Sequence, residues 1–404
     1  MQKIRNDFPL YQRKIDGKDI IYLDSACMSL KPRQVIDKIN EYYHEYPCCG
    51  GRSVHKLATK VTMEVDEARI KLKSFLNANQ ANEIVFLKNA TEGINLVSNS
   101  FGFKPGDKVM ITDREHNSNL VPWLKLIDDK GIKLVVTPSN EDNTFDLERF
   151  SELIDGSVKL VSMVHTSNLD GYTIPAKEII KIAHDHGAYV LLDGAQSAPH
   201  KQVDVQMLDV DFLVLSVHKM CGPTGVGVLY GKYDLLNELK PFIVGGSTVK
   251  RSTYTDKEYL SAPEKFEAGL QNYAGIIGAG TAAEYLTDIG LKNIQEHEIK
   301  LITYIMHQLS GLDELKLIGP NDPKLRGCIF SFNIDGVDSH DVAMILDEMN
   351  NIMIRSGMQC VHSWYLDRHL SGSARASVYI YNTEEECKIF CENVMKIIDN
   401  FAKL

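Results

Sequence analysis

The fold is decided by the segment AYVLLDGAQSAPHKQVDVQMLDVDFLVLSVHKMCGPTGVGVLYG (188–231). It contains two short runs rich in Val and Leu, 188–193 and 211–216, and a connection between them that is long enough for a helix. Unbroken apolar runs of this length are typical of strands buried on both faces of a parallel sheet. A third run, VGVLYG (226–231), follows a turn-rich stretch, so we expect it to add to the sheet in the antiparallel direction.

The same alternation of strand-like and helical patterns extends toward the N-terminus. Apolar residues recur at helical spacing in 33–45, 60–77 and 176–186. Four further strand-like runs are EIVFL (83–87), KVMIT (108–112), KLVVT (133–137) and KLVSMVH (159–165). These patterns predict an α/β fold whose large domain holds a mostly parallel, seven-stranded sheet covered by helices on both faces.

The pattern changes near residue 275. A long helical region over 275–310 is followed by two strand-like segments, 314–318 and 327–334, and by a last helix over 384–401. We therefore predict a large domain over 21–280 and a smaller α+β C-terminal domain over 281–404. The remaining segment, 1–20, is expected to pack on the small domain.

Composition limits the function classes that this chain can serve. Its 404 residues carry 44 Lys and Arg against 54 Asp and Glu, a formal charge of −10. An excess of negative charge is unfavourable for binding nucleic acid or an anionic membrane surface. The chain has no apolar run of the ~18 residues that a membrane span needs, and its polar start lacks a secretory signal. We expect a cytoplasmic protein whose eight cysteines are reduced.

Polar residues follow five of the predicted strands of the large sheet, at the edge where parallel sheets bind ligands. Each could be only a turn or cap residue, and a helix cap is the simplest reading of Thr91. Successive strand ends that are all polar point instead to one ligand site. These positions are Thr91, His116, Asn168, Asp193, Gln196, Ser216, His218 and Lys219.

Pyridoxal phosphate chemistry requires such a set. A lysine must form an imine with the cofactor aldehyde, and a carboxylate must keep the pyridine nitrogen protonated so that the ring can accept electrons. The cofactor phosphate needs donors, ideally at the start of a helix. Asp193 and Lys219 are 26 residues apart, one helix-and-strand crossover, so both can reach the same cleft.

The chain resembles a known family over nearly its whole length. It is similar to class V aminotransferase-fold enzymes of PLP-dependent transferase fold type I, and among them to the SUF-type (group II) cysteine desulfurases, also called selenocysteine lyases. The most specific match is SVHKMCGPTGVGVLYGK (216–232). Other matching blocks, in order, are YLDSACMSLKP (22–32), RSVHKLA (52–58), NATEGINLV (89–97), EHNSNLVPW (115–123), DGAQSAPH (193–200), KFEAGLQN (265–272) and SARASVYIYNT (373–383).

The resemblance implies a role for each predicted site residue. Lys219 would form the imine, His116 would stack on the pyridine ring, and Asp193 would pair with the ring nitrogen. Gln196 would bind the phenolic oxygen of the ring. Thr91, Ser216 and His218 would hold the phosphate, and Asn168 and Arg375 would hold the substrate carboxylate.

The resemblance also implies a cysteine that accepts sulfur as a persulfide, in the block IRSGMQCVHSW (354–364). Cys360 is at the nucleophile position, and Arg355, which opens the block, is expected near the substrate. We expect a flexible loop here, because the thiol must reach the substrate and then present its sulfur outside. Met358 and Gln359 replace the two histidines that commonly precede this cysteine.

Two further differences from the usual family pattern concern Leu270 and the N-terminal thiols. Relatives usually carry Thr at the position of Leu270 and donate it across a dimer to the phosphate, a contact that leucine cannot make. Cys27, Cys48 and Cys49 are enriched near predicted active-site segments. They could form a metal or iron–sulfur ligand set, a secondary sulfur relay, or ordinary buried and loop positions. Adjacent cysteines rarely share one metal and no CxxC is present, so we expect no metal site.

The leading prediction is an enzyme that converts L-cysteine to L-alanine and leaves the sulfur on Cys360, for iron–sulfur cluster assembly or other thiolation. Expected partners are a second copy of the chain, as a homodimer, and a sulfur-acceptor or scaffold protein. The alternatives are a selenocysteine lyase or another class V β-lyase and, from a different class, a sulfur carrier or scaffold with little turnover.

Overall fold

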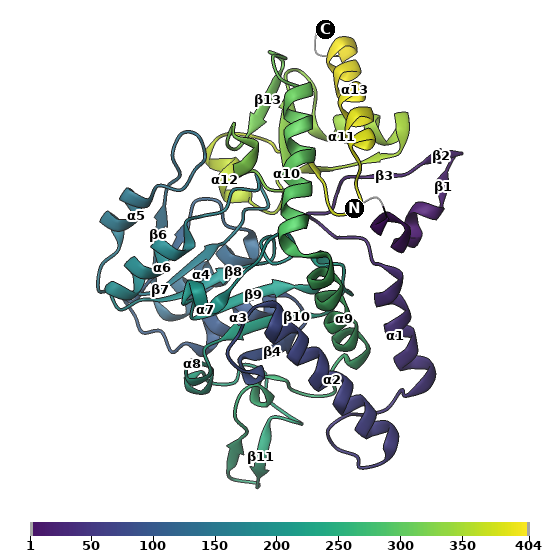
Figure 1. Ribbon diagram of the computed structural model, residues 1–404. Helices are drawn as coiled ribbons and strands as arrows, with labels where there is room; N and C mark the ends of the chain where they lie inside the picture. Colours follow the sequence, from purple (N-terminus) through teal and green to yellow (C-terminus); the bar gives the residue numbers. More distant parts are fainter. Residues whose placement is uncertain (1–2, 402–404) are drawn as a thin grey trace.

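The computed structural model describes residues 3–401 and contains the predicted large sheet (Figure 1). Its seven strands lie in the order β4-β10-β9-β8-β7-β5-β6. All neighbours pair parallel except β10, which is antiparallel to both β4 and β9. The strands are β4 Ile84–Leu87, β5 Lys108–Thr112, β6 Lys133–Thr137, β7 Val158–Val164, β8 Tyr189–Asp193, β9 Phe212–Ser216 and β10 Gly227–Gly231. The α/β class and the mostly parallel seven-stranded sheet are confirmed.

Successive strand residues point to opposite faces of this sheet, and each face is buried by its own helices. In β9, Leu213 and Leu215 join one apolar cluster, while Phe212 and Val214 join another. Helices α2, α5, α6 and α9 cover the first face, and α3 and α4 cover the second. Helices of this part are α1 Arg33–Glu45, α2 Lys56–Phe75, α3 Ala90–Ser100, α4 Asn117–Lys130, α5 Leu147–Leu153, α6 Ala176–Asp185, α7 Val205–Leu208, α8 Tyr233–Glu238 and α9 Tyr273–Ile289.

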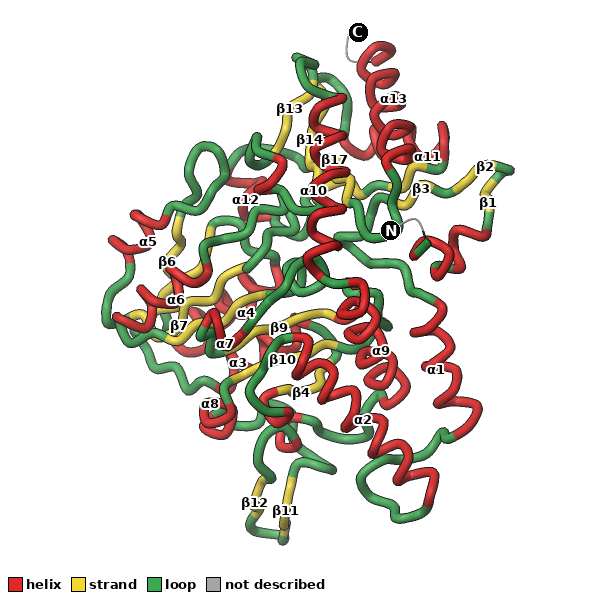
Figure 2. The backbone as a smooth tube through the Cα atoms, viewed as in Figure 1, coloured by secondary structure: helices red, strands yellow, loops and turns green. Residues whose placement is uncertain are grey.

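A second, smaller sheet of four antiparallel strands has the order β13-β14-β17-β16. Gly290, with φ +86°, ends α9, so the predicted helical region over 275–310 is two helices. Helices α10, α11 and α13 pack in the cluster that buries this sheet, as Figure 2 also shows. The elements are β13 Leu315–Ile318, β14 Ile329–Ile334, β16 Arg355–Gly357, β17 Ser373–Ser377, α10 Leu291–Gln308, α11 Ser339–Asn350, α12 His362–Asp367 and α13 Glu384–Phe401.

The N-terminal segment contacts elements from both halves of the chain. Arg5 pairs with Glu386 of α13 at 2.7 Å, and Asp7 accepts a hydrogen bond from Tyr285 of α9 at 2.9 Å. Short paired strands are β1 Lys14–Ile15 with β2 Lys18–Asp19, β3 Ile21–Tyr22 with β15 Ile352–Met353, and β11 Val249–Ser252 with β12 Lys257–Tyr259. The division into 1–20, 21–280 and 281–404 stays a prediction.

Within residues 3–401, no helix has both the length and the apolar character that crossing a membrane requires.

Gly227 lies at a close approach between the large sheet and the start of α3. It opens β10, where it lies opposite Leu87 of β4 and Ser216 of β9. A Cβ atom on Gly227 would stand 2.4–2.7 Å from the backbone atoms of Asn89, the residue that caps α3. Backbone cannot rotate away as a side chain can, so only glycine fits here.

We therefore expect Gly227→Ala to lower the free energy of unfolding by about 1–3 kcal/mol, the usual cost of overpacking, and to displace the start of α3. Gly156→Ala is the matched control, because a Cβ there meets nothing within 4 Å. Urea unfolding of both variants tests this. Equal unfolding midpoints for the two would contradict the assignment.

Candidate active site

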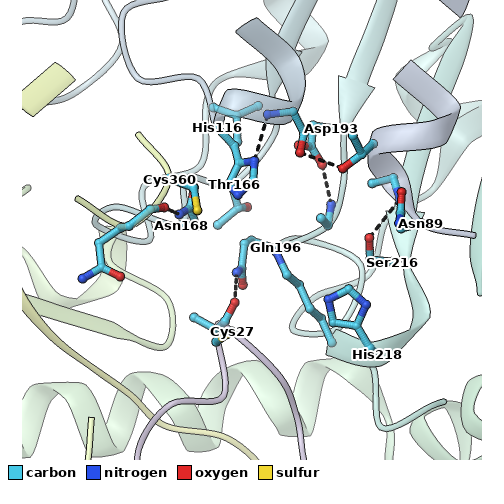
Figure 3. Close-up of a pocket in the computed structure, with 18 of the residues that line it drawn as sticks. Cys27, Asn89, His116, Thr166, Asn168, Asp193, Gln196, Ser216, His218 and Cys360 are labelled. Atoms are coloured by element: carbon cyan, nitrogen blue, oxygen red, sulfur yellow. Dashed lines mark hydrogen bonds between the residues drawn. The ribbon is translucent and has the colours of Figure 1, made fainter. Parts of the chain in front are cut away.

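The eleven predicted site residues all line one cavity of about 240 Å³ at the carboxyl edge of the large sheet (Figure 3). They come from the last residues of β8 and β9, from the segments that follow β4, β5, β7, β8 and β9, and from the small-sheet strands β16 and β17 with the turn that follows β16. They are Thr91, His116, Asn168, Asp193, Gln196, Ser216, His218, Lys219, Arg355, Cys360 and Arg375. The roles of these residues stay predictions, but the structure brings the whole set together.

The first turn of α3 forms one wall of the cavity. Asn89 caps the helix by accepting a hydrogen bond from the Glu92 N–H at 2.9 Å, so the simplest reading of Thr91 as the cap is wrong. The Thr91 hydroxyl instead lies 2.7 Å from the Ser118 hydroxyl, and the Ala90 N–H donates to Ser216 Oγ at 2.9 Å. Hydroxyls around a helix N-terminus are well suited to binding a phosphate group.

The sequence reasoning missed two residues of this cavity wall, Asn89 and Ser118. Asn89 could have been found, because Asn-x-x-Glu before an apolar run is a helix-start signal. Ser118 lies in the first turn of α4, and only its contact with Thr91 reveals that the starts of α3 and α4 meet. No sequence signal links the two helices.

Lys219 and Asp193 are a basic and an acidic group buried near the ends of the adjacent strands β9 and β8. Burial lowers the pKa of Lys219, although the nearby Asp193 charge opposes that shift. Burial likewise raises the pKa of Asp193, and the Lys219 charge and the Ala195 N–H, 3.0 Å away, oppose it. Within residues 3–401 the Lys219 amine has no hydrogen-bond partner. The pocket therefore offers a readily deprotonated amine and a carboxyl that lacks a close cation.

His116 is held as a neutral imidazole. Its Nδ1 accepts a hydrogen bond from the Ser118 N–H at 3.0 Å and caps α4, which leaves the proton on Nε2. Burial, with the charges of Lys219 and Arg375, lowers the pKa of His116 to about 3. A neutral ring that donates from Nε2 can take part in proton transfer without adding charge to the cavity.

Gln196 and Arg375 each keep one buried polar atom without a partner among the described residues. The Gln196 Nε2 donates to the Ala26 carbonyl, and its Oε1 is unpartnered. Arg375 donates from Nη1 to the Asn168 carbonyl at 2.8 Å and lies 3.4 Å from Asp24, while its Nε is unpartnered. Buried polar atoms normally have partners, so both are open to a ligand.

Cys360 lies in a short turn between β16 and α12, and the flexibility expected of this segment stays a prediction. The carbonyl of Gln359 accepts from Asn168 Nδ2, and the carbonyl of Cys360 accepts from the Asn117 N–H, each at 2.7 Å. Gln359 and Cys360 both adopt positive φ, at +51° and +59°. Two consecutive non-glycine residues persist in this region only where surrounding contacts hold them, and these two hydrogen bonds do so.

Arg355, expected near the substrate, contacts the thiol of Cys27. Its Nη1 lies 2.9 Å from the Sγ of Cys27, which also lines the cavity. Cys48 packs against an apolar cluster instead, and Cys49 lies 3.9 Å from the Tyr273 hydroxyl. The three N-terminal thiols therefore do not gather into one ligand set.

One other group of potential metal ligands occurs in the part of the chain that the structure describes: His200, Glu298 and Cys328, all buried. His200 Nδ1 lies 2.7 Å from a Glu298 oxygen and its Nε2 lies 3.7 Å from Cys328 Sγ. The two ring nitrogens of His200 thus link the Glu298 carboxyl to the Cys328 thiol.

Comparison with known proteins agrees with this geometry. The model of the aminotransferase class-V family matches residues 21–390, so the chain belongs to that family. A probable cysteine desulfurase from Synechocystis is 42% identical, with 99% of this chain and 96% of that protein covered. Within the family, the chain belongs with the cysteine desulfurases, which are enzymes.

Two solved structures are also similar over almost the whole chain. An apo cysteine desulfurase from Thermococcus onnurineus has a TM-score of 0.94 and 36% identity, covering 99% of this chain and 98% of that one. A cysteine desulfurase from Escherichia coli, in an S-sulfonic acid form, has a TM-score of 0.90 and 32% identity with the same coverage. The predicted resemblance to cysteine desulfurases is confirmed.

The environment of Asp193 gives a pH-dependent prediction for the protein without ligand. Because the pKa of Asp193 is raised on folding, the folded state holds its proton more tightly than the unfolded state does. The Asp193 contribution to stability is therefore greatest below its unfolded pKa, near 3.9, and is lost as pH rises toward the folded value.

We expect cofactor-free Asp193→Asn to be at least as stable as the wild type at pH 8. The stability advantage of the variant should shrink as pH falls toward 4. Thermal unfolding of both proteins between pH 4 and 8 tests this, since the pair differs only in the Asp193 carboxyl and in the pKa of Lys219, which the Asp193 charge raises. The opposite result would be a stability difference, Asp193→Asn minus wild type, that is lower at pH 8 than at pH 4. It would show that other groups compensate the Asp193 charge in the cofactor-free protein.

Proposed function

We propose that this protein is a pyridoxal-phosphate-dependent cysteine desulfurase that converts L-cysteine to L-alanine and takes up the sulfur as a persulfide on Cys360. The observation that carries the proposal is that Lys219, Asp193 and Cys360 line the same cavity. An amine, a buried carboxylate and a thiol in one pocket match the three chemical needs of this reaction: imine formation, an electron sink, and a sulfur acceptor.

The residues present fit the cofactor. The start of α3, with Thr91, Ser216 and His218, would hold the phosphate, and Lys219 would hold the aldehyde carbon. Asp193, whose pKa burial raises, would pair with the protonated ring nitrogen, and Gln196 would bind the phenolic oxygen. When bound, pyridoxal phosphate supplies an electron sink that labilises bonds at the α-carbon of an amino acid.

The remaining residues would bind and orient the substrate. The unpartnered Nε of Arg375 is a buried donor that suits a carboxylate, and Asn168 is bonded to the backbone turn that carries Cys360. Through this bond, the substrate side of the pocket and the nucleophile are held in fixed relation. The Lys219 amine, with its lowered pKa, can accept a proton from the substrate and return one to the product.

Sulfur transfer then needs the Cys360 thiolate. Its attack forms a sulfur–sulfur bond while the bond from sulfur to the substrate β-carbon breaks, and the product carbon takes up a proton. The alternatives, a selenocysteine lyase, another β-lyase or a carrier of little turnover, share the fold, and the dependence of the reaction on Cys360 distinguishes them. A sulfur-acceptor or scaffold protein and a cytoplasmic location stay predictions.

We expect Cys360→Ala and Cys360→Ser to retain the cofactor, visible as an absorbance band above 400 nm, and to lose ~100-fold or more of alanine production from L-cysteine. Lys219→Ala, the control for the cofactor chemistry, should have no turnover at all. Alanine and sulfide are measured separately. Undiminished alanine production by Cys360→Ala would favour an elimination that needs no thiol acceptor.

A homodimer is part of the same proposal. Leu270, Val244 and Val54 are 72%, 54% and 98% exposed. The segments that carry them meet, because the Gly269 N–H donates to the Gly246 carbonyl and Arg52 bonds to Ser247. Exposed apolar side chains clustered in this way are typical of a protein interface.

Leu270→Glu should therefore shift the protein from dimer to monomer in light scattering, raising the dissociation constant ~100-fold by burying a charge. Met344→Glu is the control, because Met344 is similarly exposed, at 57%, on α11. A wild-type monomer with full activity would be incompatible with the proposed dimer.

A further inference from the structure

Two thiols, not one, line the proposed active-site cavity. Cys360 enters from the turn after β16, and Cys27 enters from the turn after β3 (Figure 3). Negative charge at either sulfur raises the pKa of Lys219, so both thiols lie within electrostatic range of the same amine. Of the other six cysteines, four are buried, and neither Cys48 nor Cys49 reaches the cavity.

The turn that carries Cys27 is hydrogen-bonded both to the small sheet and to the edge of the large sheet. The Ala26 N–H donates to Ser377 Oγ of β17 at 2.9 Å, and the Ala26 carbonyl accepts from Gln196 of the large-sheet edge. The Cys27 N–H closes a turn on the Asp24 carbonyl at 3.1 Å. The neighbouring Ala26 is buried, whereas the Cys27 side chain is half-buried and faces the cavity.

Arg355 places positive charge directly against this sulfur. The 2.9 Å contact with Cys27 Sγ is the only hydrogen bond of the Arg355 side chain among residues 3–401, and no carboxylate there lies within ion-pair distance of it. A guanidinium beside a thiol stabilises negative charge on sulfur, which is the nucleophilic form. It would stabilise the anion of a persulfide in the same position equally well.

We propose that Cys27 is a second sulfur-accepting residue, which takes the outer sulfur from the Cys360 persulfide and so lets one active site hold two sulfur atoms. The inference rests on the proposed desulfurase function and goes beyond it. It gives Arg355 a role as the residue that positions and activates Cys27.

The transfer balances without any oxidant or reductant. The Cys27 thiolate attacks the outer sulfur of Cys360–S–SH, a new sulfur–sulfur bond forms on Cys27, and the old one breaks. Cys360 leaves as a thiolate, and the proton stays with the transferred sulfur. Cys360 is then ready for a second molecule of L-cysteine before any acceptor has removed the first sulfur.

Mass spectrometry can follow the two thiols separately. Trypsin would release Cys27 in the peptide 19–33 and Cys360 in the peptide 356–368, each with no other cysteine. Holoenzyme is exposed to L-cysteine for increasing times, alkylated and digested. We expect the added sulfur to appear first on Cys360 and then on Cys27, reaching about two sulfane sulfur atoms per protomer.

Variants separate this inference from the proposed function. Cys27→Ala should stop at about one sulfur, on Cys360, whereas the control Cys48→Ala should still reach about two. Cys360→Ala should carry none on either peptide. A wild type that saturates Cys360 and leaves Cys27 unmodified would overturn the relay alone, while a wild type with no sulfur on Cys360 would overturn the desulfurase proposal and the relay with it.

Two further results would also overturn the relay. Sulfur on Cys27 in Cys360→Ala would mean that Cys27 takes it directly from the substrate. A cross-linked pair of the two peptides, with sulfide released, would mean that attack occurs at the inner sulfur.

Alkylation of the cofactor-free protein tests the role of Arg355 without turnover. Iodoacetamide should modify Cys27 ~10-fold more slowly in Arg355→Ala than in wild type, with Arg355→Lys between them, because the thiolate is the reactive form. Cys49 serves as the internal control and should react at the same rate in all three. An unchanged Cys27 rate in Arg355→Ala would remove Arg355 from the proposal.

Discussion

The burial of two opposite charges, Asp193 and Lys219, at the ends of adjacent parallel strands is the constraint on which the rest of the site depends. Neither group has a close ion-pair partner among the described residues, and burial shifts the pKa of each toward its neutral form. Two buried ionisable groups without partners destabilise the ligand-free protein, and a ligand that pairs with them removes this cost. The buried apolar clusters on both faces of the sheet around β8 and β9 supply stability that offsets this cost.

Around this pair the cavity is assembled from parts that are far apart in the chain. The turn at Ala26 is bonded to Gln196 of the large sheet edge and to Ser377 of the small sheet. The turn at Cys360 is likewise bonded to Asn117 and Asn168. Each thiol is therefore presented by a turn whose backbone is anchored on the large sheet, which fixes where a sulfur atom can enter and leave.

The length of the segment that carries Cys360 determines how its sulfur can be delivered. A thiol on a long mobile loop could carry its sulfur out of the pocket, whereas the short turn at Cys360 holds it against α4. A second thiol in the same cavity, with Arg355 beside it, offers the sulfur a place to go without moving the turn. The proposed relay and the short, hydrogen-bonded turn thus belong to one geometry.

The sequence by itself determined the strands of the large sheet and pointed to eleven residues that line one cavity. All seven strands of the large sheet were predicted to within about a residue, because buried parallel strands are short unbroken apolar runs. The eleven site residues followed from strand-end positions and family blocks, since both are local in the chain. The strand β17, Ser373–Ser377, was not expected as a strand, because its small and polar residues lack an apolar pattern.

Only the tertiary structure decided which side chains touch. Nothing local in IRSGMQC indicates that Arg355 lies against Cys27, 328 residues away, or that Asn168 and Asn117 hold the cysteine turn. The meeting of Thr91 with Ser118 is equally invisible in the chain. The physical reason is that periodicity reports which face of an element is buried, whereas contacts between elements depend on how the two sheets and the N-terminal turn pack together.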